Sequence, residues 1–196
     1  MGDIKSAREI AMEKIEKLGE PTEEERLRWK YVPQGEELAI KYLKEDRNLV
    51  NELNRHKEDV RKYIIEGATR IMVRNIDLPK NDVAKKNNRK AMDGIKALKN
   101  DKVGVENVYS RIRNIFNHYN NEGEQQRKQA YESLKVDFEA KIQQAVQQQL
   151  GTFVAAKVDV EKQPQFHQEW RNLLVRLDAQ YLALLDEYKR ELLEIG

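Results

Sequence analysis

The fold is decided near the C-terminal end of the chain, where residues 166–195 read FHQEWRNLLVRLDAQYLALLDEYKRELLEI. Apolar residues recur there at alternating intervals of mostly three and four, and Gln, Glu, Arg, Asp and Lys fill the gaps. The recurring residues are Phe166, Trp170, Leu173, Leu177, Tyr181, Leu184, Tyr188, Leu192 and Ile195. This spacing places them on one stripe of a helix, which has to be buried against other helices. The stripe predicts packing and indicates no reaction.

The composition favours helices with a wide polar face. Of the 196 residues, 39% are hydrophobic and 36% are charged, against about 45–50% and about 25% in typical domains. Proline and glycine are few, and strong helix formers are abundant. The sequence therefore predicts an all-α fold, an elongated bundle of long antiparallel helices with coiled-coil-like packing. We expect a single domain over residues 1–196, with a subdivision near 79–81 or 151–164 as the alternative.

Glycine and proline mark the expected helix ends in the first part of the chain. A first helix is predicted from about Asp3 to Leu18, ended by Gly19 and Pro21. Thr22 and Glu25 form the capping box of a short second helix, which the sequence VPQG at 32–35 should end. Trp29 and Tyr31 stand beside this break. Exposed, they would be candidate binding residues, but tryptophan is usually mostly buried, so we expect them to close one end of the bundle.

A long helical segment is expected from Gly35 to Ile76, with a bend around residues 46–48. Leu78-Pro79 should end it, because the residue before a proline disfavours the helical conformation. Gly67 lies in the middle of this segment, where glycine costs about 1 kcal/mol relative to alanine. Close approach of another helix is the simplest explanation for this glycine.

Two further helical segments are expected before the C-terminal stripe. Asn81 can cap a helix that runs to about Leu98, and residues 100–104 should form a loop. A long segment over residues 105–150 follows, with a turn or kink at residues 120–123. Residues 157–161 alternate in polarity like a strand, but a lone short strand has no partner. We therefore expect an ordered connection over residues 152–164.

The middle of the chain carries excess positive charge. Residues 67–105 contain 10 Lys and Arg against 4 Asp and Glu. Four cations cluster on one helix as candidate phosphate contacts, namely Lys85, Lys86, Arg89 and Lys90. Basic and aromatic residues also alternate nearby, as in single-strand binders, at Tyr109, Arg111, Arg113, Phe116 and Tyr119. Phe116 and Tyr119 fall on an apolar stripe, however, and are expected in the core. The excess charge is small and no base-reading module accompanies it, so a solvated helix face is favoured and nucleic acid binding is unlikely.

No motif of catalysis or metal binding is present. The chain has no cysteine, which excludes disulfides, thiolate metal sites and cysteine nucleophiles. The three histidines are far apart in sequence, and neither a glycine-rich phosphate loop nor a serine-nucleophile motif occurs. We therefore predict no catalytic residue, metal ligand or cofactor. No apolar run reaches the roughly 20 residues that a membrane span needs, and we expect a cytoplasmic protein.

These observations favour a non-enzymatic structural or adaptor protein that acts through helix–helix interfaces, with a protein partner or a second copy of itself. The candidate interface lies on the C-terminal stripe and consists of Trp170, Leu173, Leu177, Tyr181, Leu184 and Tyr188. Two alternatives stay open. One is weak, sequence-independent nucleic acid binding through residues 80–102. The other is an enzyme or small-molecule binder whose site no motif reveals.

Overall fold

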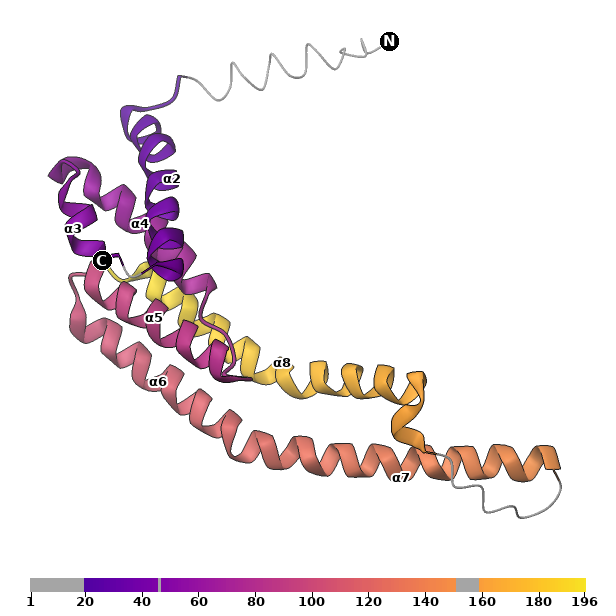
Figure 1. Cartoon of the computed structure of the whole chain (residues 1–196). Helices are drawn as coiled ribbons and strands as arrows, with labels where there is room; N and C mark the ends of the chain where they lie inside the picture. The colour runs from indigo at the N-terminus through magenta and orange to yellow at the C-terminus, as the bar shows by residue number, and fades with distance from the viewer. Residues whose placement is uncertain (1–19, 46, 151–158) are drawn as a thin grey trace, which may run out of the picture. The chain divides into compact units, whose positions relative to one another are not determined.

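The computed structural model describes residues 20–45, 47–150 and 159–196, and every regular element in these ranges is helical. The helices are α2 (Glu23–Lys44), α3 (Leu49–Asn54), α4 (Glu58–Arg74), α5 (Asp82–Leu98), α6 (Lys102–Asn120), α7 (Glu122–Leu150) and α8 (Pro164–Glu194), with the short 3-10 helix η1 (Val160–Lys162) before α8 (Figure 1). The predicted all-α fold with long helices is confirmed. Coiled-coil-like packing stays a prediction. The helix expected at 3–18 lies outside the described residues.

The chain divides into two compact units. The N-terminal unit extends to Met72 and the C-terminal unit starts at Val73, within the last turn of α4. The expectation of a single domain over residues 1–196 stays a prediction.

Helix α2 is longer than the sequence indicated. Its capping box is present, because the Glu25 amide donates to Thr22 Oγ1 at 3.2 Å and the Thr22 amide donates to Glu25 Oε2 at 2.7 Å. The expected break at residues 32–35 is wrong. The helix continues to Lys44 with Pro33 inside it, and Gly35 is buried within it. Packing against α4 explains why the helix continues through these residues.

Helices α2 and α4 cross at two glycines. A Cβ atom added to Gly35 would lie 2.0 Å from the carbonyl oxygen of Ile64, and one added to Gly67 would lie 2.0 Å from that of Val32. The predicted close helix approach at Gly67 is therefore confirmed, and Gly35 serves the same contact instead of ending a helix. Val32 also packs in a buried cluster around this crossing, whose other members are Val60 and Tyr63 with Leu27 and Tyr31 beside them.

Trp29 lies on α2 beside this contact, and its residue surface is 66% exposed. The expectation that it is buried is wrong. The face of α2 that packs inward contains Val32, Gly35 and Leu38, and Trp29 lies about a third of a turn away from it.

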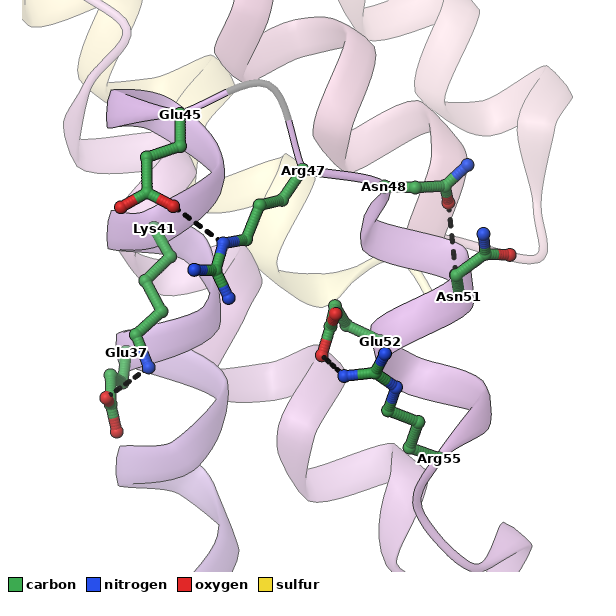
Figure 2. A network of polar contacts seen from close by, with 8 residues as sticks. All are labelled: Glu37, Lys41, Glu45, Arg47, Asn48, Asn51, Glu52 and Arg55. Carbon is green, nitrogen blue, oxygen red and sulfur yellow. Dashed lines mark hydrogen bonds and ion pairs between the residues drawn. The ribbon is translucent and has the colours of Figure 1, made fainter.

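The expected long helix over residues 35–76 is three helices instead of one bent helix. Helix α2 ends at Lys44 and α3 begins at Leu49, so a first turn lies near the predicted bend, and a second turn lies at residues 55–57. Figure 2 shows the first of these turns, where Arg47 pairs with Glu45 at 2.6 Å and the Asn48 side chain accepts from the Asn51 amide at 3.0 Å. These contacts are exposed, so the ion pair contributes at most about 1 kcal/mol. The Asn48 cap gives α3 its start.

The C-terminal unit is built from α5 to α8. The predicted cap of α5 is confirmed, since Asn81 Oδ1 accepts from the Ala84 amide at 2.9 Å. The predicted break at 120–123 is also confirmed, because Asn121 alone separates α6 from α7. Helix α8, about 45 Å long, runs back along α7 and then α6 (Figure 1). Of the uncertain connection, residues 151–158 lie outside the described chain and Val160–Lys162 form η1.

Hydrogen bonds fix the segment between α4 and α5. Buried Asn88 of α5 accepts from the Asp77 amide at 2.9 Å and donates to the Asp77 carbonyl at 2.6 Å. Lys80 pairs at 2.7 Å with Asp178 of α8, whose side chain is 8% exposed.

Among the described helices, none combines the length and the apolar character that a membrane-spanning helix requires.

Candidate functional site

The predicted interface on α8 divides into two parts, and the first part packs within the chain. Trp170 is half-buried and meets the ring of Tyr131 edge-on, with centroids 5.1 Å apart. Phe166, fully buried, contacts Tyr131 and Phe138 in the same way at 5.4 and 5.6 Å. Leu173 is half-buried on the same stripe. This end of α8 is therefore engaged by α7.

The second part of the predicted interface lines a groove between α6 and α8, which we call the α6–α8 groove. Its volume is about 480 Å³. The four α8 residues that the stripe predicted here are all present in its wall, namely Leu177, Tyr181, Leu184 and Tyr188. Ile115 of α6 adds a further apolar surface. Leu184 is 46% exposed, so the predicted stripe is only partly covered by its own chain.

Two polar contacts hold the walls of the α6–α8 groove. His118 Nδ1 and the Tyr181 hydroxyl lie 2.8 Å apart. Arg111 Nη1 donates to Glu191 Oε1 at 2.8 Å, its second nitrogen donates to the other carboxylate oxygen, and the guanidinium lies 4.6 Å from the Tyr188 ring centre. The Glu191 carboxylate raises the pKa of Arg111, chiefly by accepting these hydrogen bonds. Both contacts join α6 to α8 across the groove.

The charge of the α6–α8 groove is one-sided. Two arginines, Arg111 and Arg176, line it, and no carboxylate does. Glu191 neutralises Arg111, whereas Arg176 forms no ion pair within residues 20–45, 47–150 and 159–196. Three amide side chains complete the rim, contributed by Asn114, Gln126 and Gln180. The groove thus combines an apolar wall, amide side chains and one positive charge that no carboxylate of the described residues neutralises.

The buried residues of α8 are Phe166 and Leu192, which belong to the predicted stripe, and Asp178 and Leu185, which lie beside it. A charged residue gives no sequence signal for burial. Asp178 is accommodated because Lys80, far away in sequence, neutralises one of its oxygens; the other has no hydrogen-bond partner among the described residues.

The predicted phosphate contacts do not form one group. Lys85 and Arg89 line a second groove, between α5 and α6, of about 410 Å³, which we call the α5–α6 groove. Lys86 and Lys90 are not part of its lining. The additional cations are Lys96 and Arg113, which were not among the predicted contacts. Only the packing of α6 against α5 brings these residues together. In the described part of the chain, no cluster of three or more His, Asp or Glu side chains could hold a metal ion.

Residues 50–194, which include both grooves, match the family of unknown function DUF6657. The chain belongs to this family. No curated protein and no solved structure matches it. In this DUF6657 protein the matched region begins in α3, so α2 with Trp29 lies outside it, whereas α5 to α8 and the residues that line both grooves lie inside.

Proposed function

We propose that this protein is a non-catalytic structural or adaptor protein that assembles through helix–helix contacts, and that its α6–α8 groove receives helix α8 of a second copy. The observation that carries this proposal is the incomplete coverage of α8. Leu184 is 46% exposed beside a groove whose wall contains two tyrosines, two leucines and two arginines. Tyrosine and arginine are enriched in interface cores and among the residues that dominate binding energy.

The charges along α8 favour a second copy over an unrelated partner. Arg176 and Glu187 lie about three turns apart and therefore on the same edge of the helix. Neither forms an ion pair within the described residues. In a symmetric dimer the same patch faces itself. An antiparallel pairing of two α8 helices about an axis near Tyr181 places Arg176 opposite Glu187 of the second copy, and Leu177 opposite Leu184.

A charge-swap series tests this pairing. We expect the wild-type protein to sediment as a concentration-dependent dimer. Arg176→Glu alone and Glu187→Arg alone each set like charges opposite one another, and each should weaken the dimer. The double variant restores opposite charges in both pairs, so it should recover dimerisation. A network that merely stabilised the monomer would not show this recovery.

A second variant tests the apolar part of the same contact. Leu184→Asp places a charge on an exposed position, so we expect a folded monomer with unchanged helicity by circular dichroism. Val175→Asp is the matched control, because Val175 is 69% exposed on the same helix and does not line the groove. A wild-type protein that stays monomeric at high concentration, or single charge variants that dimerise normally, would show that the groove does not receive α8 of a second copy.

A further inference from the structure

The α5–α6 groove contains charged and aromatic residues that the adaptor proposal does not use. Two contacts fix the register of α5 against α6. Lys96 Nζ donates to Glu106 Oε2 at 2.8 Å, and the Tyr109 hydroxyl donates to the Met92 carbonyl at 2.6 Å. Because α5 and α6 are antiparallel neighbours joined by a short loop, the backbone positions of Arg89 and Arg113 lie opposite each other, one turn beyond Met92 and Tyr109. Both arginines line the groove.

The carboxylates near this pair leave it with excess positive charge. Glu106 bonds both Lys96 and Arg113, and hydrogen bonds first from Lys96 and then from Arg113 lower the pKa of Glu106. The single negative charge of Glu106 is thus shared between the positive charges of Lys96 and Arg113. Arg89 has no ion pair within the described ranges.

Two more charged residues line the α5–α6 groove. Lys85 pairs with Asp82 at 3.2 Å, but the Asp82 side chain is 97% exposed, so water screens this pair. Asp93 is the other carboxylate in the lining, and it forms no ion pair in the described chain. The lining therefore contains four cations and two carboxylates, and a bound anion would reduce the repulsion among the cations.

The floor of the α5–α6 groove is apolar and partly aromatic. Met92, Tyr109 and Pro79 are buried and line it, and Phe116 is half-buried. The volume of about 410 Å³ falls in the range of about 300–1,000 Å³ that small-molecule sites occupy. An anionic group bound by Arg89 would leave the apolar surface at Phe116 for a flat ring.

We propose that the α5–α6 groove binds a small phosphorylated ligand with a ring system, of the nucleoside phosphate class. The fork of a guanidinium matches the oxygens of a phosphate, and Arg89, which forms no ion pair in the described chain, provides such a fork in the groove, while Arg113 and Lys96 share Glu106 and add positive charge beside it. The aromatic surface at Phe116 suits a stacked base. A continuous nucleic acid strand is disfavoured, because Lys86 and Lys90 lie outside the groove. The site does not depend on the pairing of α8.

Titration calorimetry on the full chain tests the proposal with ADP, adenosine and inorganic pyrophosphate as probes. We expect ADP to bind with a Kd of roughly 10–500 µM at about 50 mM salt, and more weakly at about 200 mM. Adenosine and pyrophosphate should each bind less tightly than ADP, because each supplies only half of the contacts. Arg89→Gln should weaken ADP binding about ten-fold or more, since it removes charge-assisted hydrogen bonds.

Lys86→Gln is the matched control, because it removes the same charge from an exposed position of α5 outside the groove. It should change the Kd for ADP less than about two-fold, which surface charges of this kind allow. The proposal is overturned by absent ADP binding at millimolar concentration, or by equal weakening in both variants. It is also overturned if an oligothymidylate binds more tightly than ADP and loses affinity with Lys86→Gln, which would assign the basic face to a nucleic acid strand.

Discussion

Gly35 and Gly67 occupy the same crossing of α2 and α4, each where the backbone of the other helix comes closest. A Cβ on Gly35 would lie 2.0 Å from the Ile64 oxygen, and a Cβ on Gly67 would lie 2.0 Å from the Val32 oxygen. The hydrogen that glycine carries in that direction points at the carbonyl, as in the Cα–H···O contacts of close helix pairs. The two glycines therefore determine how closely the helices approach.

Gly67→Ala should destabilise the N-terminal unit. Alanine favours helix by about 1 kcal/mol, but its methyl group would overlap a backbone oxygen, which cannot move as a side chain can. Overpacking of this kind costs typically about 1–3 kcal/mol or more, and here we expect the upper part of this range to exceed the gain in propensity. Urea unfolding followed by circular dichroism measures the difference.

Gly123→Ala is the control for this substitution. Its Cβ would meet the Tyr181 hydroxyl at 3.0 Å and Arg127 Nη1 at 3.2 Å, which are the ends of flexible side chains. We expect its stability to stay within about 1 kcal/mol of the wild type. If Gly67→Ala were equally neutral, the two helices would not be held at the separation described here.

Local signals in the sequence predicted local structure well. Thr22 and Asn81 cap helices because the capping hydrogen bond spans only three residues, and sequence alone determines it. Pro33 and Gly35 led to the wrong prediction of a helix end, because the structure at this position depends on a distant part of the sequence. Their local preference is to end a helix, but α4 packs against α2 at this position, and tertiary packing overrides propensity.

The stripe on α8 predicted the helix and one of its packing faces, but not how that face is used. Leu177 and Leu184 line a groove only because α6 lies beside them, and the register of α6 depends on contacts such as Arg111 with Glu191. The same holds for Arg89 and Arg113, which belong to different helices. The periodicity of a sequence identifies the packing face of one helix. A site formed by two helices also depends on where the second helix lies, and periodicity gives no information about that.

Asn88→Ala should loosen the segment that precedes α5. Asn88 is 3% exposed, and its side chain bonds both the amide and the carbonyl of Asp77. Removing it leaves two backbone groups without partners, at a cost of about 1–3 kcal/mol for each group that stays buried. We expect a loss on the order of 2–3 kcal/mol in urea unfolding. Asn87→Ala, at the exposed neighbouring position, should change stability by less than about 1 kcal/mol.

Phe166→Ala should separate the start of α8 from α7. The ring is fully buried between Tyr131 and Phe138, and deleting such a ring typically costs about 3–5 kcal/mol. Trp170 also packs on Tyr131, so its fluorescence should shift to the red in the folded variant. Val175→Ala, at a 69% exposed position, is the control and should leave both stability and emission unchanged. An unshifted Trp170 spectrum in Phe166→Ala would contradict the aromatic packing.

The stability of the C-terminal unit should fall at alkaline pH because of Tyr119. Burial first, and then the negative charge of Asp178, raise the pKa of Tyr119 from 10.0 to about 12. The unfolded chain therefore loses this proton at a lower pH than the folded chain. The stabilisation is fully present below pH 10 and is lost as the pH rises toward 12, at up to about 1.4 kcal/mol per pH unit.

Tyr119→Phe has no proton to lose, so its stability should fall less steeply. Urea unfolding at successive pH values from 9 to 12 measures both slopes. Lysines titrate in this range in both proteins, so the comparison is between the two slopes, and parallel curves would show that Tyr119 is not the responsible group.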